Sequence, residues 1–178
     1  MAIIRHGVLL LTGLFAAIAG ISDWRTRRIP NWLTVPGLVL GIGVNFAEGK
    51  WMGVRESLLG AGLGLLLLLP FVLIRSLGAG DWKLVGALGA FLGPHRLLAV
   101  LFLSVLIAGV MALILIVWKG RVRQTLRNIT HMLAAFFSFH LPGPEVSLEN
   151  PESLKVPFGV AVAGAVLFYV VAQLWGVA

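Results

Sequence analysis

The chain has 178 residues, of which 59% are hydrophobic and 12% charged, and its mean hydropathy is +0.99. A soluble globular domain carries about 25% charged residues, so this composition excludes a water-soluble fold and favours a membrane protein. The chain has no cysteine and no pair of histidines at helical metal spacing, so we expect no disulfide, no metal site and no cofactor.

Six apolar stretches without charge follow one another along the chain. They comprise residues 7–22, 31–47, 57–74, 84–94, 97–118 and 156–178. A helix needs about 20 residues to cross about 30 Å of hydrocarbon, so the third, fifth and sixth are long enough, and the first two extend into their flanks. The fourth spans only if it begins near Gly80 and ends near His95, and otherwise forms a re-entrant half-helix. We predict an all-α polytopic membrane protein with six transmembrane helices, in one domain over residues 1–178.

The first stretch also resembles a secretory signal, because Arg5 precedes it and an Ala-Ile-Ala sequence at 17–19 forms a candidate cleavage site. However, three arginines follow at once between positions 25 and 28, and such a cluster opposes translocation. We therefore expect residues 7–22 to be a retained helix.

The only long polar segment, residues 119–155, separates the fifth and sixth stretches. Apolar residues at positions 122, 126, 129, 133 and 136 follow helical spacing, and basic residues occupy the other faces. This pattern is typical of a helix that lies on an anionic membrane surface. We predict a cytoplasmic interfacial amphipathic helix over residues 121–139, in contact with membrane lipids, followed by a loop.

The basic residues predict the orientation of the chain in the bacterial inner membrane. Ten of the fourteen Lys and Arg fall in segments 23–30, 75–83 and 119–155, which six crossings place on one side. By the positive-inside rule this side is cytoplasmic, so both termini are expected outside. The formal net charge of +7 forms no single basic patch, so we expect no nucleic-acid partner.

The chain has two aspartates, and both fall at predicted helix ends on the cytoplasmic face. Asp23 closes the first helix, and Asp81 lies where the third helix gives way to the fourth. An ionisable group at the edge of hydrocarbon costs about 2.5–3.5 kcal/mol or less on insertion scales, which suggests that it is kept for a use. Two carboxyl groups that approach closely hold one proton near neutral pH, so one can activate water while the other polarises a carbonyl. Gly78 and Gly80 would loosen the backbone beside Asp81 and line a wet cavity.

Other interpretations account for the same residues. Asp81 could be the N-cap of the fourth helix, the glycines could mark an ordinary turn, and Asp23 could be a polar residue among interfacial arginines. A transporter would use the two aspartates for ion relay and would hold them near mid-bilayer. A non-catalytic subunit of a pilus or secretion machine would tolerate the replacement of either aspartate by asparagine.

The residues around both aspartates resemble those of the type IV prepilin peptidases, of the GxGD aspartyl class. In that family a basic segment that ends in Ile-Pro-Asn follows the first catalytic aspartate, and the segment after Asp23 ends with Ile29, Pro30 and Asn31. The second motif, Gly-x-Gly-Asp-x-Lys-Leu, is matched by residues 78–84, with Gly78, Gly80, Asp81 and Lys83 at its defining positions.

A third family element, a basic residue followed by Pro-Phe/Tyr-Gly, is echoed by Lys155, Pro157, Phe158 and Gly159. Val160 replaces the proline that commonly ends this element, and we expect this change to affect helix geometry rather than chemistry. Larger members carry an extra cytoplasmic segment, often with paired cysteines, where this chain has only residues 23–30. The chain resembles the short, peptidase-only form found with Flp-type pili, so we expect no N-methylation.

The resemblance implies an aspartyl endopeptidase that removes the leader peptide of a prepilin or pseudopilin at the cytoplasmic face. The catalytic residues would be Asp23 and Asp81, supported by Pro30, Asn31, Gly78, Gly80 and Lys83, with Lys155, Pro157, Phe158 and Gly159 in contact with substrate or lipid. For Lys83 and Lys155 an interfacial anchor with a snorkelling amine is an equal alternative. Among enzymes, the archaeal preflagellin peptidases are the nearest alternative.

Overall fold

The computed structural model describes residues 2–74, 76–120, 122, 123, 125, 127, 130 and 156–175. Within these ranges the regular elements are all helices: α1 (Ala2–Thr26), α2 (Asn31–Leu73), α3 (Ala79–Trp118) and α5 (Phe158–Leu174). The predicted all-α class is therefore confirmed. Lys155 lies outside the described residues, as does most of the predicted interfacial helix, 121–139.

Three of these helices are long and apolar enough to cross a membrane, over Gly7–Thr26, Asn31–Leu73 and Ala79–Trp118. The fourth, α5, is apolar and 17 residues long. The spans of α2 and α3 are each about twice the length that one crossing requires. Their length is explained by reversals of the chain within each helix.

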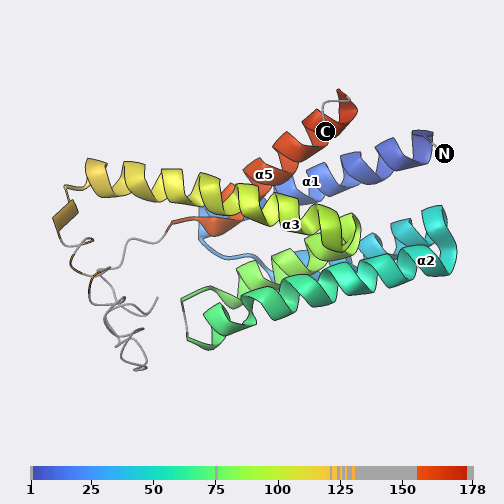
Figure 1. Ribbon diagram of the computed structural model, residues 1–178, viewed down its shortest axis with the longest axis horizontal. Helices are drawn as coiled ribbons and strands as arrows, with labels where there is room; N and C mark the ends of the chain where they lie inside the picture. The colour runs from blue at the N-terminus through green and yellow to red at the C-terminus, as the bar shows by residue number, and fades with distance from the viewer. Residues whose placement is uncertain are drawn as a thin grey trace.

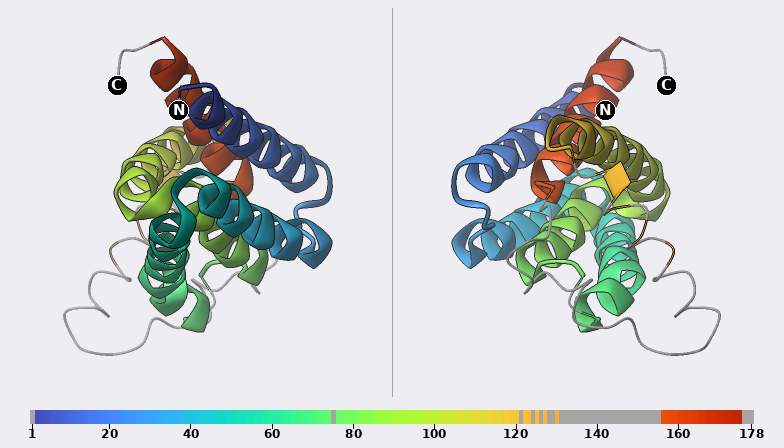
Figure 2. Two further views of the ribbon diagram at one scale, coloured as in Figure 1. Left: turned by 90° about the vertical axis from the view of Figure 1, so that its right-hand side faces the viewer. Right: turned by 90° about the vertical axis from the view of Figure 1, so that its left-hand side faces the viewer.

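Both long helices turn back on themselves. α2 is interrupted at Lys50 (φ 50°, ψ −133°) and α3 at Gly93 (φ 73°, ψ 173°). The side chains of Asn45 and Ser57 form a 2.9 Å hydrogen bond across the first reversal, although twelve residues of straight helix would separate them by about 18 Å. Each helix therefore consists of two arms, which lie antiparallel and side by side in α2 and diverge from the reversal in α3 (Figures 1 and 2). The four arms correspond to four of the apolar stretches predicted as separate helices.

Proline and glycine explain the reversal in α3. Gly93 has the positive φ that favours glycine, and Pro94 has no N–H to donate to the carbonyl of Ala90. The side-chain amide of Asn45 donates to this carbonyl at 2.7 Å and to that of Phe91 at 3.1 Å. Asn45 thus caps the first arm of α3 and joins it to α2.

The first arm of α3 forms the centre of the molecule. Every residue from Leu84 to Gly93 is buried. Gly60 of α2 and Gly89 of α3 meet backbone to backbone, and neither position has room for a Cβ. Small residues of this kind let membrane helices approach closely. The stretch predicted as the fourth helix is therefore a short arm, about 21 Å long by helical rise, that is enclosed by protein.

α1 packs mainly along α5, as Figures 1 and 2 show. Phe15 joins α1 to the other two helices, because its ring stacks on Phe91 of α3 with centroids 5.4 Å apart and rests on Gly37 of α2. As a result, the C-terminal end of α1 and the N-terminal ends of α2, α3 and α5 meet at one end of the bundle. Both predicted catalytic aspartates lie at this end.

Candidate active site

Asp23 is held between the last turns of α1 and the first turn of α5. Its side chain is buried, with 6% of the residue exposed. The oxygen Oδ2 accepts a 3.3 Å hydrogen bond from the backbone N–H of Val160. Such N–H groups at a helix N-terminus have no partner within the helix and favour an anion. A Cβ at Gly159 would lie 2.9 Å from both Cβ and Oδ2 of Asp23, so glycine makes this approach possible.

Asp81 is the third residue of α3. The N-cap of this helix is Gly78, without a side-chain hydrogen bond to the cap. The Asp81 carboxyl group folds back over the cap, since a Cβ at Gly78 would lie 3.2 Å from its Oδ2. The interpretation of Asp81 as the N-cap is therefore wrong, because Gly78 occupies that position.

The first turn of α3 packs against residues 27–30, the segment that connects α1 to α2. A Cβ at Gly80 would lie 3.1 Å from the carbonyl oxygen of Ile29 and 3.3 Å from its nitrogen. Lys83 Nζ donates a 2.9 Å hydrogen bond to Oδ1 of Asn31, the first residue of α2. Lys83 therefore connects the second motif to the first, a contact that sequence reasoning missed.

The connection between α1 and α2, residues 27–30, is fixed by hydrogen bonds. The Thr26 hydroxyl lies 3.0 Å from the carbonyl oxygen of Arg28, and the N–H of Arg27 donates to the carbonyl of Asp23 at 2.9 Å. Pro30 forms the N-cap of α2 with φ −75°. This segment thus has a defined path, which places its backbone against the turn that carries Asp81.

The two carboxyl groups come from different helices and share one end of the bundle. They are close enough that the charge of Asp23 acts on Asp81, and Arg27 acts on Asp23. The part of the chain that the structure describes contains no group of three or more His, Asp or Glu that could hold a metal ion. This end of the bundle holds two carboxyl groups, and the backbone N–H of Val160 donates to one of them.

Val160 corrects one expectation from the sequence. α5 begins regularly at Phe158, so the residue in place of proline does not disturb the helix. Instead, the backbone N–H that a proline would lack donates to Asp23. The replacement therefore affects the chemistry around the carboxylate. The sequence shows that Val160 has an N–H, but not that this N–H donates to Asp23, because the bond joins residues 137 positions apart.

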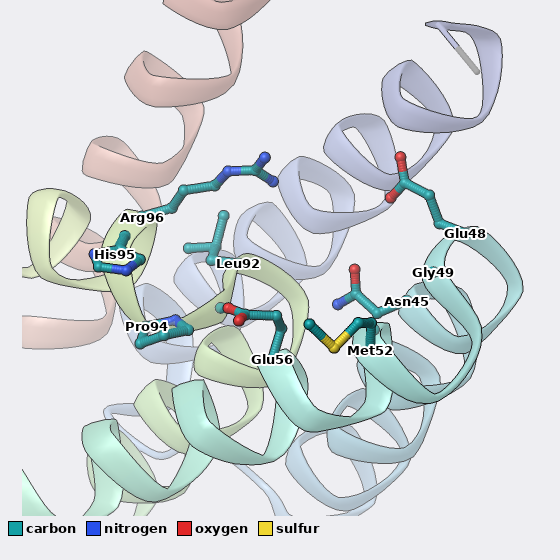
Figure 3. Close-up of a pocket in the computed structure, with 11 residues that line it drawn as sticks. Asn45, Glu48, Gly49, Met52, Glu56, Leu92, Pro94, His95 and Arg96 are labelled. Atoms are coloured by element: carbon teal, nitrogen blue, oxygen red, sulfur yellow. The ribbon is translucent and has the colours of Figure 1, made fainter.

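A pocket of about 440 Å³ lies away from the aspartates, where α2 and α3 reverse (Figure 3). Twelve residues of helix, about 18 Å of rise, separate Asp81 from Gly93 in the pocket wall. The pocket shares no residue with the surroundings of Asp23 and Asp81 described above. It is therefore a separate feature of the molecule.

The fold and the aspartate pair define a helical membrane protein with two acidic side chains gathered at one end of its bundle. The sequence profile of the type IV leader peptidase family matches residues 10–113, which include both aspartates. This match covers more than half of the chain. The chain therefore belongs to the type IV leader peptidase family.

Curated relatives agree with this assignment. A prepilin leader peptidase/N-methyltransferase of Xanthomonas campestris pv. campestris is 32% identical over 126 residues, which cover 67% of this chain and 43% of that protein. The protein of the same name from Neisseria gonorrhoeae is 35% identical over 125 residues, or 66% of this chain and 43% of that protein. One from Burkholderia pseudomallei (strain 1026b) is 37% identical over 120 residues, or 62% and 38%. The matched region thus spans less than half the length of these relatives. No solved structure matches the chain significantly.

Proposed function

We propose that this chain is an aspartyl endopeptidase that removes the leader peptide from prepilin-like substrates, with Asp23 and Asp81 as its catalytic pair. The observation that carries the proposal is the convergence of α1 and α3, which brings two carboxyl groups within electrostatic reach at one end of the bundle. Family membership supports the leader-peptide substrate.

In the proposed mechanism Asp23 acts as the base and Asp81 as the acid. The α5 N–H that donates to Asp23 stabilises its ionised form. Asp23 takes a proton from water while the water oxygen attacks the scissile carbonyl carbon, and protonated Asp81 gives its proton to the carbonyl oxygen. The tetrahedral diol then collapses: the Asp81 carboxylate takes back a proton from one hydroxyl, the proton held by Asp23 passes to the leaving nitrogen, and the C–N bond breaks.

The proposed site lies at the cytoplasmic face, with six crossings and both termini outside. Ten of the fourteen Lys and Arg lie on the side of the aspartates under this topology. The substrate helix would lie in the bilayer beside the enzyme. Phe158, the partly exposed first residue of α5, would contact substrate or lipid together with Lys155 and the interfacial helix, and the buried Pro157 before it would support this turn.

We further propose that the activity is limited to cleavage, although the relatives' names include N-methyltransferase. Only residues 27–30 join α1 to α2, and the chain has no cysteine. No segment between these helices could therefore form an additional cytoplasmic domain.

The positions of the aspartates favour a peptidase over an ion relay. Asp23 lies within the last turn of α1, and Asp81 lies in the first turn of α3. A relay in a transporter requires acidic groups near the middle of the bilayer. Carboxyl groups at helix ends are instead placed to reach a peptide bond of the substrate at the boundary between membrane and water.

Co-expression with a candidate prepilin tests the proposal. Wild type should shorten the prepilin, and Asp23→Asn or Asp81→Asn should each lower the cleavage rate by about 10²–10⁴-fold while the protein still inserts. Arg55→Gln is the control, because it removes a charge from an exposed residue at the other end of the bundle that does not line the pocket there. Retained cleavage by either aspartate variant would refute the pair and favour the non-catalytic subunit. The mass of the new N-terminus shows whether a methyl group is added.

A further inference from the structure

The pocket at the chain reversals has charged walls of both signs. Glu48 and Glu56 extend from the two arms of α2, and His95 and Arg96 follow the reversal of α3 (Figure 3). Glu56 and Arg96 are exposed. Their side chains therefore reach a ligand from outside without rearrangement of the core.

These charged side chains do not neutralise one another. Within the part of the chain that is described, Glu48, Glu56 and Arg96 form no ion pair. The side-chain amide of Asn45, which also lines the pocket, is already used by the capping bonds to α3. Two carboxylates and a guanidinium thus line about 440 Å³ of space, and no described residue forms an ion pair with them.

Exposed aromatic side chains lie beside the pocket. Trp51 is 79% exposed beside the reversal of α2, and its ring meets Phe46 edge to face with centroids 6.0 Å apart. Aromatic side chains of this kind gather at the level of lipid headgroups. Met52 lines the pocket and is itself exposed, so apolar surface continues from the pocket onto the outside of α2.

We propose that this pocket binds the headgroup of a zwitterionic phospholipid that carries a primary ammonium, of the phosphatidylethanolamine class. Arg96 and His95 would donate hydrogen bonds to the phosphate, and Glu56 and Glu48 would accept them from the ammonium. A pocket of this size is within the range that holds small ligands, about 300–1,000 Å³. The lipid's acyl chains would lie on the exposed apolar surface of α2.

The same residues select against other lipids. An anionic headgroup without an ammonium would leave both carboxylates unpaired and facing its charge. A quaternary ammonium has no N–H to donate to a carboxylate, and it is usually bound by aromatic rings, of which the pocket wall has none from Phe, Tyr or Trp. The preferred order is therefore phosphatidylethanolamine over phosphatidylcholine and phosphatidylglycerol.

Native mass spectrometry of the full chain, reconstituted with each of these three lipids with matched acyl chains, tests the proposal. Wild type should retain one phosphatidylethanolamine in preference to the other two lipids. Arg96→Gln and Glu56→Gln should each weaken retention roughly 10- to 100-fold, as expected for the loss of a charged hydrogen bond. Arg55→Gln removes a positive charge from an exposed residue that does not line the pocket, and it should retain the lipid as wild type does.

Several outcomes would overturn the proposal. The first is that Arg96→Gln and Arg55→Gln retain equal amounts of the lipid. The second is that wild type retains phosphatidylglycerol or phosphatidylcholine as strongly as phosphatidylethanolamine. Saturation by soluble phosphoethanolamine at equal concentration would identify a free headgroup as the ligand instead. The comparison of lipids uses wild type alone, so it holds even if a variant fails to fold. Since the readout is bound lipid, the result is independent of peptidase activity.

Discussion

Asp23 owes its environment to residues at the opposite end of the sequence. Val160 donates its N–H to the carboxylate, and Gly159 leaves the space that the carboxylate fills. The first turn of α5 therefore positions a carboxyl group that belongs to α1. A shift of about 1 Å in such a group can cost about a hundredfold in rate.

Gly159→Ala should lower leader cleavage by about tenfold or more, because the new Cβ would lie 2.9 Å from Oδ2 of Asp23 and force the carboxylate away. Gly164→Ala is the control on the same helix, since its Cβ meets only Ile107 Cδ1, at 3.8 Å. The cleavage rates of both variants are compared at equal amounts of inserted protein. Equal rates would show that the Asp23–α5 contact does not matter for catalysis.

At this scale the sequence identifies the acidic residues but not their partners. Asp23 and Asp81 are found because they are the only aspartates and lie at helix ends. The contact of Gly80 with Ile29 and the bond from Lys83 to Asn31 join segments that are distant in sequence. Such pairings depend on tertiary packing, which residue types and spacing do not encode.

The helical elements show which boundaries an apolar pattern can predict. The apolar stretches 31–47 and 57–74 are correctly separated, but helical structure continues through the charged residues between them and reverses at Lys50. Charged residues end a hydrophobic stretch but need not end a helix. The helix is held by its backbone hydrogen bonds, and these do not depend on whether the side chains are apolar or charged. In α3 the chain reverses at Gly93, next to Pro94, whereas the predicted break lies slightly later, at residues 95 and 96.

Asn45→Ala should destabilise the folded protein by about 1–3 kcal/mol, because the carbonyls of Ala90 and Phe91 lose their donor within the core. Asn45→Asp, which keeps the shape and removes the donors, should be at least as harmful. Thermal unfolding in detergent measures both. Gly43→Ala on the same arm has open space around its Cβ and should be neutral or slightly stabilising. An unchanged melting temperature for Asn45→Ala would mean that Asn45 is not the cap.

For the whole molecule, the bundle has two different ends. One collects the aspartates and the starts of α2, α3 and α5, and the other contains both chain reversals and the charged pocket. Under the proposed topology, most of the Lys and Arg residues lie on the same side of the membrane as the first end. The proposed catalytic and lipid-binding sites would thus face opposite sides of the membrane.

Single-cysteine labelling measures this orientation directly, since the chain has no other thiol. In intact spheroplasts a membrane-impermeant maleimide should react with Trp51→Cys, at the reversal of α2. It should not react with Ser76→Cys, between α2 and α3, until the membrane is permeabilised. The reverse pattern would place the aspartates outside and exclude cleavage at the cytoplasmic face.

The mechanism requires the side chains at positions 23 and 81 to meet in the membrane-inserted protein. A chain with Asp23→Cys and Asp81→Cys should be linked by a short bifunctional thiol reagent, whereas Asp23→Cys with His95→Cys, at opposite ends of the bundle, should not. Mass spectrometry of the cross-linked peptides provides the measurement. If both thiols of the first pair react with a monofunctional reagent but are never linked, the two aspartates do not share a site.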